Sequence, residues 1–339
     1  MSNLPPSGEI PRGAIRFNTD SNKPELWNGS QWAEFQLSTP NLASAGDRQP
    51  GARGLMGGGQ GGSPATTQTR IDAINISSAG DSINFGDLSD ARYAPAAASD
   101  KTRAIWGGGN TNNDRIDSVI FGSGGTAIDF GDLSQGRRGA SACSSATRSV
   151  FAGGVASPEP TIVSTMDYIT TQTGGTAQGW TDSLEAVQTN TSACASPTRG
   201  IFAGGGPSLT NRIEFITIAT LGGVQDFGDI LEASSDNIAC SNPVRGMMGG
   251  SLTPTVLNVI QYVTLSTTGN SINFGDLTRT LQHGNACSSP TRAVWMGGVT
   301  VNVIDYVQIM TTGNAVDFGD LSLARWSGNS GISNAHGGL

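Results

Sequence analysis

Four cysteines are the residues with the widest chemical repertoire in this sequence, because thiolates bind metals and attack electrophiles. They are Cys143, Cys194, Cys240 and Cys287, and each stands five residues before an arginine of a repeated block. Metal-binding cysteines usually come in closer pairs, such as Cys-x-x-Cys, and no such spacing is present. Equivalent positions of a repeat usually stand too far apart for disulfides. We therefore interpret the four as small buried residues.

Six aspartates form a second candidate set, one in each copy of another repeated block. They are Asp87, Asp132, Asp182, Asp229, Asp276 and Asp320. A calcium site needs about six to eight converging oxygens, which one acid per repeat does not supply. We expect each aspartate instead to cap its glycine turn or to form a structural ion pair with the repeat arginine some 16 residues later.

Catalytic motifs have little support. The chain has two histidines, His283 and His336, and neither a Ser-His-Asp constellation nor a nucleophile elbow is recognisable. The glycine-rich residues 57–62 lack the Lys-Ser/Thr ending of a phosphate-binding loop. Glycosidases use two carboxylates, and Asp182 with Glu185 is the pair that stays open for that chemistry. We predict no catalytic residue, no metal and no cofactor.

Two blocks recur six times along the chain, with successive copies of the first block 45 to 51 residues apart. The first is an arginine followed by apolar residues and a glycine doublet, and its arginines are Arg53, Arg103, Arg148, Arg199, Arg245 and Arg292. The second reads aromatic-Gly-Asp-Leu, with aromatics at Phe85, Phe130, Trp180, Phe227, Phe274 and Phe318. The third copy is degenerate. Two blocks that keep one phase through six cycles indicate a repeat architecture.

Each repeat is expected to contain four strands. In the last repeat these are residues 285–288, 292–296, 304–309 and 314–321. The alternation in Ile304-Asp305-Tyr306 indicates a strand with one buried face. Four short strands in a unit of about 50 residues match one blade of a kelch-type propeller. We predict an all-β fold with a six-bladed, kelch-like β-propeller of four-stranded blades.

The amino-acid sequences of the repeats also resemble those of a known group of proteins. Runs such as Ile-Asp-Tyr-Val at 304–307, followed by Asp-Phe-Gly-Asp-Leu at 317–321, and the ending Ser-Asn-Ala-His-Gly-Gly-Leu at 333–339 are present. They resemble the Gly-rich repeat proteins of tailed bacteriophages, especially marine and cyanobacterial ones. The glycine doublets resemble those of kelch repeats, whose usual fourth-strand tryptophan has a counterpart only at Trp180. The resemblance covers roughly residues 51–339 and implies a virion protein.

The C-terminus is expected to close the propeller. In most copies the block aromatic lies 18 residues before the next repeat arginine, as from Phe274 to Arg292. Counting 18 residues from Phe318 reaches His336, so the tail supplies an additional first strand at residues 328–333. The first repeat has only a poor match to its own first strand. An unpaired edge would otherwise remain, and we predict that the C-terminal strand completes the first blade.

Residues 1–36 form a separate N-terminal module. The Asn28-Gly29 dipeptide between apolar runs is a strong hairpin signal, and the segment resembles a short β-meander of phage tail-fibre and other virion proteins. Such a small module buries little core, so we expect its apolar face to pack on a partner or on its own copies. That face comprises Ile15, Phe17, Leu26, Trp27 and Trp32. The alternative is an extra hairpin on the propeller. Residues 37–50 are predicted to be a linker to the propeller domain, residues 51–339.

Composition limits the partners. With 48 glycines and 14% charged residues, the chain suits short strands with tight turns better than helices. The net charge is −8 without a basic cluster, so no nucleic-acid partner is expected. No signal peptide and no apolar run near the roughly 20 residues of a membrane span are recognisable. We expect a soluble protein, made in the host cytoplasm, without membrane insertion.

These features favour a non-enzymatic virion protein, with a tail-associated fibre or adhesin as the leading hypothesis. The module would attach to other virion proteins, and the variable loops at residues 60–69, 110–113, 157–165 and 207–211 would gather on one face to contact a host glycan or receptor. Symmetric virion parts imply a homo-oligomer. Two alternatives stay open: a capsid decoration or head-fibre protein, and a propeller lectin or glycan-degrading enzyme.

Overall fold

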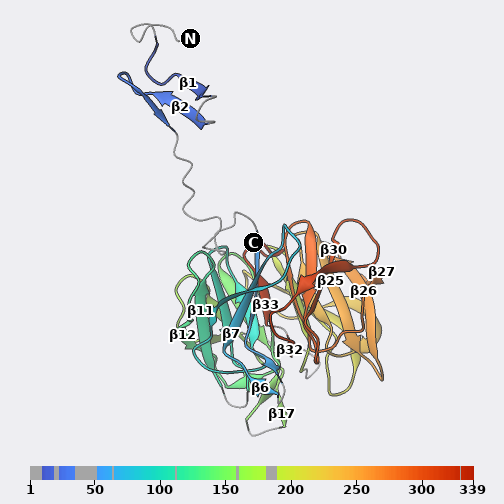
Figure 1. The fold of residues 1–339 in the computed structure, drawn as a ribbon. Coiled ribbons are helices and arrows are strands. Elements are labelled where there is room, and N and C mark those ends of the chain that lie inside the picture. The colour runs from blue at the N-terminus through green and yellow to red at the C-terminus, as the bar shows by residue number, and fades with distance from the viewer. Residues whose placement is uncertain are drawn as a thin grey trace. The chain divides into compact units, whose positions relative to one another are not determined.

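The computed structural model describes residues 10–18, 23–34, 52–62, 65–110, 113–157, 160–180, 189–328 and 330–339. It divides into two compact units, Met1–Arg48 and Gln49–Leu339 (Figure 1). The described residues form strands and turns only, which confirms the all-β class. Among them, no helix has the length and apolar character needed to cross a membrane. The predicted linker, 37–50, lies outside the described residues.

The first unit is a three-stranded antiparallel sheet. Its strands are β1 (Ile15–Asn18), β2 (Lys23–Trp27) and β3 (Trp32–Glu34). The predicted turn between β2 and β3 is present: Gly29 has φ +101°, which a residue with a side chain rarely adopts. Asn28 closes the turn, because its backbone N–H donates to the carbonyl of Gln31 at 3.1 Å.

The apolar residues of this sheet lie on two faces. Ile15 pairs with Leu26, and Trp27 pairs with Trp32. Because side chains alternate along a strand, Ile15, Phe17 and Leu26 share one face, and the two tryptophans share the other. The prediction of a single apolar face was therefore wrong. Trp27 is buried with its ring centroid 5.5 Å from that of Trp32, whereas Ile15 and Phe17 are 67% and 59% exposed.

Within its described residues, the second unit contains six four-stranded antiparallel sheets. Sheet I is β33 (Gly331–Ser333), β4 (Arg53–Gly57), β7 (Arg70–Asn75) and β8 (Ile83–Asp87). Sheet II is β9 (Ala96–Ser99), β10 (Arg103–Gly107), β11 (Arg115–Ile120) and β12 (Ile128–Asp132). Sheet III is β14 (Ser141–Ser144), β15 (Arg148–Ala152), β18 (Met166–Thr170) and β19 (Gln178–Gly179).

The remaining sheets repeat the same strand order. Sheet IV is β20 (Ser192–Ala195), β21 (Arg199–Ala203), β22 (Thr210–Thr217) and β23 (Gln225–Ser234). Sheet V is β24 (Ile238–Ser241), β25 (Arg245–Leu252), β26 (Val256–Thr264) and β27 (Ile272–Asp276). Sheet VI is β28 (Asn285–Ser288), β29 (Arg292–Met296), β30 (Val303–Gln308) and β31 (Val316–Asp320). The predicted strands of the last repeat match sheet VI to within two residues at each end.

Short strands tie some connections to the following sheet. They are β5 (Gln60–Gly61), β6 (Thr66–Thr67), β13 (Arg137–Arg138), β16 (Val155–Ala156), β17 (Thr161–Ile162) and β32 (Arg325–Trp326). β13 pairs with β16, and β32 pairs with β5. In each case a segment that leaves one sheet pairs with an extension beyond the second strand of the next sheet. This pairing fixes the path of the connection.

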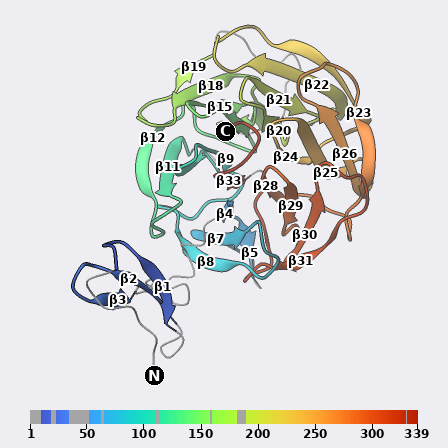
Figure 2. The ribbon, with the colours of Figure 1, turned by 90° about the horizontal axis from the view of Figure 1, so that it is seen from above.

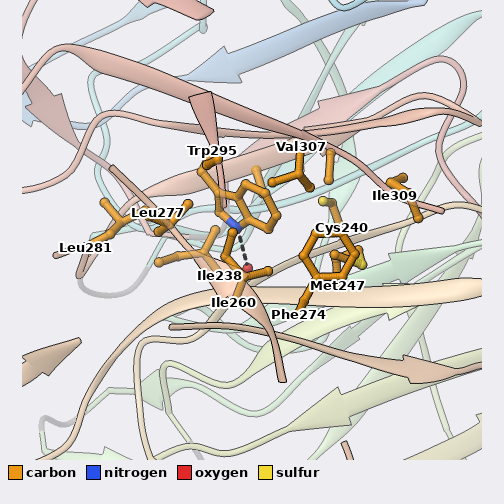
Figure 3. Packing of buried hydrophobic residues seen from close by; sticks show 13 residues of the cluster. Ile238, Cys240, Met247, Ile260, Phe274, Leu277, Leu281, Trp295, Val307 and Ile309 are labelled. Carbon is orange, nitrogen blue, oxygen red and sulfur yellow. Dashed lines mark hydrogen bonds between the residues drawn. The ribbon is translucent and has the colours of Figure 1, made fainter. Parts of the chain in front are cut away.

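The six sheets follow one another around a common centre (Figure 2). Their first strands lie innermost and contact each other in the order β9, β14, β20, β24, β28, β33 and back to β9. One buried apolar cluster lies at each junction of neighbouring sheets. Between sheets V and VI, Trp295 packs among aliphatic side chains, and its Nε1 donates to the carbonyl of Ile238 at 3.0 Å (Figure 3).

The C-terminal strand completes sheet I. β33 pairs antiparallel with β4, so that Gly331 stands opposite Met56. The expected contribution of the tail to the first sheet is therefore confirmed, over residues 331–333 of the predicted 328–333. The tail then follows the start of β4, where Asn334 Oδ1 accepts the backbone N–H of Arg53 at 2.8 Å.

The six sheets lie around a central axis. The pairing of β33 with β4 places the start of β4 and the C-terminus at one end of that axis. The opposite end carries the loops between second and third strands and the connections from each fourth strand to the next first strand. Figure 1 shows β6, β17 and β32 at that end and the C-terminus at the other. We call the end with β6, β17 and β32 the mouth end of the axis, and the end with the C-terminus the tail end.

Candidate functional site

Buried arginines hold the connections at the mouth end. After three of the outer strands the chain reads Asp-Leu-Ser-x-x-Arg, and this arginine is buried in each case. The three are Arg92, Arg137 and Arg325. A fourth arginine, Arg279, follows its Asp-Leu-Thr directly and so lies two residues earlier than the pattern, and its side chain is 15% exposed. Fully buried arginines are rare unless they are paired.

Each of these arginines faces an acid in the third strand of the following sheet. Arg92 Nη2 lies 2.5 Å from Asp117 Oδ2, and both side chains are fully buried. The corresponding distances are 2.8 Å for Arg137–Asp167, 3.1 Å for Arg325–Asp72 and 3.9 Å for Arg279–Asp305. A serine or threonine of the motif also donates to the acid, as Ser89 Oγ does to Asp117 at 2.7 Å. Each pair therefore connects two neighbouring sheets.

The pairs are electrostatically demanding. Burial lowers the pKa of the Arg92 guanidinium from its ordinary value, and the charge of Asp117 opposes that shift. Burial likewise raises the pKa of Asp305, against the hydrogen bond from Thr278 and the charge of Arg279. Removing one partner would leave the other as an unpaired charge shielded from water, which strongly destabilises the folded state. These contacts therefore set the geometry of the connections.

The next residue of three connections points to the axis instead. Tyr93, Arg138 and Trp326 each follow a buried arginine and line a cavity at the mouth end. One or two residues later, each of these connections contains a residue with left-handed backbone. The other three connections contain such a residue as well. These residues, with φ between +52° and +64°, are Ala94, Gly139, Asn190, Asp236, His283 and Gly328. Left-handed backbone is unfavourable for most residues other than glycine, and four of the six are not glycine, so the ring of sheets enforces the turn at those four.

Backbone hydrogen bonds link the left-handed residues around the axis. Gly139 N–H donates to the carbonyl of Ala94, Asn190 N–H to that of Gly139, and Asp236 N–H to that of Asn190, at 3.0 to 3.1 Å. Gly328 N–H donates to the carbonyl of His283 at 3.2 Å. At the two remaining steps the contacts are between side chains.

Aromatic and charged side chains make those two contacts. The rings of Tyr93 and Trp326 meet edge-on with centroids 5.4 Å apart, and His283 lies against Trp326 at 5.3 Å. His283 Nδ1 lies 2.8 Å from Asp236 Oδ1. Burial acts to lower the pKa of His283, but the hydrogen bond and the charge of Asp236 outweigh it, and its pKa is raised.

These residues enclose the axial pocket, a cavity of about 200 Å³. Its walls are Tyr93, Ala94, Arg138, Gly139, Asn190, Asp236, Asn237, Ile238, His283, Gly284, Trp326 and Gly328. Every connection contributes at least one of them. A concave site with aromatic walls and a few converging polar groups has the character of a small-molecule binding site.

The tail end of the axis is closed. Small residues of the inner strands leave a cavity of about 40 Å³ there, and the C-terminal residues lie across it. His336 Nε2 lies 3.2 Å from Ser144 Oγ, and Gly337 N–H donates to the carbonyl of Ser241 at 2.7 Å. A side chain at Gly338 would collide with the carbonyl oxygen of Ser144. Burial lowers the pKa of His336 to about 4.

Serines near the ends of the inner strands stabilise this closed end. The hydroxyl of Ser241 donates to the carbonyl of Ala195 at 2.7 Å, and Ser288 donates to Ser241 at 2.7 Å. Ser333 continues the series to Ser288 at 2.5 Å, and Ser99 to Ser333 at 2.8 Å. The tail strand is thus one link of a hydrogen-bonded series that runs from sheet II through sheets I, VI and V to sheet IV.

The six repeat arginines act between neighbouring sheets. Each lies on an aromatic ring of its own sheet and donates to a backbone carbonyl of the next, as Arg199 does 4.8 Å from the ring centroid of Phe215 and 3.0 Å from the carbonyl oxygen of Leu265. The acceptors, for Arg53 through Arg292 in order, are Phe121, Thr171, Ile218, Leu265, Ile309 and Ile76. The last arginine reaches sheet I, so the series is cyclic.

The repeat aspartates do not form the ion pairs with repeat arginines that were one of their two expected roles. Among the described residues, no ion pair joins one of them to a repeat arginine, because the guanidinium groups are occupied by rings and carbonyls. Their backbone carbonyls instead accept an N–H from the next sheet, at 2.7 to 2.8 Å, at Asp87, Asp132, Asp229, Asp276 and Asp320. Asp182 and Glu185 lie outside the described residues. A side chain at the adjoining Gly86 would collide with the carbonyl oxygen of Gly125, so the block needs its glycine.

The cysteines are buried free thiols, as expected. Cys143 Sγ lies against Gly200 of the following sheet, where a side chain would not fit, and Cys194 meets Gly246 in the same way. Burial raises the pKa of Cys194 to about 12, so its thiol stays protonated. Across the described part of the chain, no group of three or more His, Cys, Asp or Glu side chains is placed to hold a metal ion.

Sequence reasoning missed the axial pocket and the buried ion pairs. The recurring Asp-Leu-Ser-x-x-Arg was a usable signal for the arginines. The acids in the third strands gave no signal, because they occupy ordinary positions in the alternation of apolar and polar residues.

In comparisons with known proteins, no family model matches the chain and no curated protein matches its sequence.

Proposed function

We propose that the second unit is a six-bladed, kelch-like β-propeller, and that the protein is a non-enzymatic structural protein of a bacteriophage virion. The cyclic contacts of the six inner strands and the completion of sheet I by the C-terminal strand support the propeller. The likeness of the repeats to Gly-rich phage proteins supports the virion role. Within the virion, a tail-associated fibre or adhesin is the role we favour.

One observation carries the recognition role: the two ends of the axis are built differently. The chain enters beside the tail, at the closed end, since Arg53 and Asn334 are hydrogen-bonded there. The axial pocket and the loops of differing sequence lie at the other end. A rigid scaffold that gathers variable loops and a pocket on one side is suited to binding a partner. The mouth end is accordingly the surface that would meet a host glycan, a receptor or another virion subunit.

The N-terminal unit is the proposed attachment module. Its exposed Ile15 and Phe17 offer an apolar face to other virion proteins or to further copies of the chain. We also propose a symmetric homo-oligomer in the virion, because virion parts are symmetric.

Immunogold labelling of purified virions with an antibody against residues 52–339 tests the proposal. We expect label at the tail and retention of the isolated protein by host cells, without release of soluble sugar. Label on the head would replace the tail role by capsid decoration. Virions without label would refute the virion role, and released sugar would refute the non-enzymatic one.

A further inference from the structure

We propose that the axial pocket binds one uncharged pyranose unit of a glycan, and that it is the specificity site of the mouth end. The inference rests on the proposed recognition function and adds a ligand class and a place. A pyranose has an apolar face of C–H groups and a rim of hydroxyls, so it needs an aromatic wall and several hydrogen-bonding groups opposite.

The two kinds of wall lie on opposite sides of the axis. Tyr93 and Trp326 come from neighbouring connections, those from sheet I to II and from sheet VI to I. Asn190 and Asp236 come from the connections that are third in the circle from them, III to IV and IV to V. Both pairs line the same cavity. A flat ring between them would therefore contact aromatic carbon on one side and amide and carboxylate oxygens on the other.

A buried amide in the pocket lacks a partner. Asn237 is 1% exposed, and its Nδ2 donates to Ser234 Oγ at 3.0 Å. Its Oδ1 is shielded from solvent and has no hydrogen-bond partner among the described residues, and Asn237 is one of the residues that line the cavity. An unsatisfied buried acceptor is unfavourable by about 1 to 3 kcal/mol in general, and a ligand hydroxyl that reaches Oδ1 from the cavity after a small side-chain movement would remove that penalty.

The charged groups of the pocket are engaged within its wall, which favours an uncharged ligand. Arg138 Cζ lies 5.9 Å from the ring centroid of Tyr93. Asp236 is held by His283 at 2.8 Å through Oδ1 and by the hydroxyl of Ser235 at 3.1 Å through Oδ2. Its carboxylate is thus engaged inside the wall and is not free to pair with a cation. The cavity of about 200 Å³ is also smaller than the roughly 300 Å³ at which pockets for larger ligands begin. A single sugar ring is the ligand of matching size.

Saturation-transfer NMR and calorimetry with free glucose, galactose, mannose, rhamnose and N-acetylglucosamine test the inference on the full chain. We expect at least one of them to bind with a Kd in the millimolar range, as is usual for one small polar ligand. Trp326→Leu and Asn237→Ala should each weaken binding about tenfold or more, because they remove the aromatic wall and the free acceptor. Val316→Ala, at an exposed position of the outer strand β31 and outside both the pocket and the variable loops, should bind like the wild type. Thermal melting establishes that each variant is folded.

Absence of signal from all five sugars would overturn the inference. So would binding that survives both pocket substitutions, or binding seen only with glucuronic acid or choline as charged probes. The outcome is separable from that of the proposed function. If Trp326→Leu protein still adheres to host cells, the pocket assignment fails while recognition stands; if sugars bind but virions carry no label, the pocket stands while the virion role fails.

Discussion

The two ends of one axis differ sharply, although the same six sheets build both. At the tail end, inner strands of Ala, Cys and Ser converge around a cavity of about 40 Å³, and the C-terminal residues close it. At the mouth end, the connections leave about 200 Å³ lined by Tyr93, Trp326, His283 and Asp236. Strands that meet at a small radius need small side chains, whereas connections at the same axis are free to vary. The closed end therefore holds the ring together, and the open end is available for function.

Deleting residues 327–339 should have the largest effect and would break the closed end. It removes β33, leaves β4 with an unpaired edge, and deprives Trp106 Nε1 of the carbonyl of Ser330, which it meets at 2.9 Å. We expect loss of cooperative unfolding in circular dichroism melts. Deleting only 337–339 keeps the strand and should leave a cooperative transition at a lower Tm. If the longer deletion melts like the intact chain, closure by the tail is refuted.

Asp117→Ala tests whether the buried ion pairs maintain the mouth end. It leaves the fully buried guanidinium of Arg92 without its acid, and we expect about 3 to 5 kcal/mol less stability to urea. Asp132→Ala, at the exposed end of the outer strand β12, is the matched control and should change stability by about 0.5 kcal/mol. Equal losses of stability in the two variants would show that the buried pairs contribute no more to stability than an exposed aspartate does.

Mild acid should loosen the tail end through His336. Its pKa is about 4 in the folded protein, below the ordinary value of 6.5, so folding favours the neutral ring. The ring faces Ser144 Oγ, the Ser99 carbonyl and the Gly338 N–H, with Asp100 nearby. The stability that depends on the neutral form is complete above pH 6.5 and is lost as the pH falls toward 4.

The expected loss is up to about 3 kcal/mol between these pH values. Urea unfolding at a series of pH values measures it, with His336→Gln as the reference that subtracts the titration of carboxylates. The difference between the two proteins should shrink as the pH falls. A difference that stays constant from pH 7 to pH 4 would contradict a buried neutral histidine.

Ala94→Gly should have the smallest effect and sharpens the account of the mouth end. Ala94 has φ +52°, where a side chain is unfavourable, and the five equivalent positions are also left-handed. Glycine relieves the strain but adds freedom to the unfolded chain, so we expect a gain of about 0.5 to 1 kcal/mol. Calorimetric melting measures it, and Ala96→Gly in the neighbouring strand should destabilise. A loss of stability in Ala94→Gly would mean that the turn is not strained.

Much of the architecture was predictable because it repeats. Arg292 and Phe274 belong to blocks that kept one phase through six copies, and this phase located the strands of sheet VI and the tail strand of sheet I. The cysteines were correctly read as small buried residues, since they occupy the same place in four copies and Ala98 occupies it in another. The alternation of apolar and polar residues was sufficient to locate the strands that have one buried face.

Contacts between sheets were less predictable. The pairing of repeat aspartates with repeat arginines failed because the choice of partner depends on the angle between sheets, which a one-dimensional pattern does not contain. The same limit applies in the first unit, where the apolar residues Ile15 and Trp27 fall on opposite faces once the register is set. Asp117 gave no signal in sequence because any residue of an alternating strand could occupy its place.

The sequence by itself determined the all-β class, the six repeats, their strands and the role of the C-terminal strand, because hydrophobic period and turn residues act over short distances. Only the tertiary structure decided which arginine meets which acid, and that six connections distant in sequence converge on one pocket. Those contacts depend on the circular closure of the sheets, which brings Tyr93 beside Trp326 across more than 200 residues of chain. The two ends of the axis thus share a repeat and differ in what converges on them.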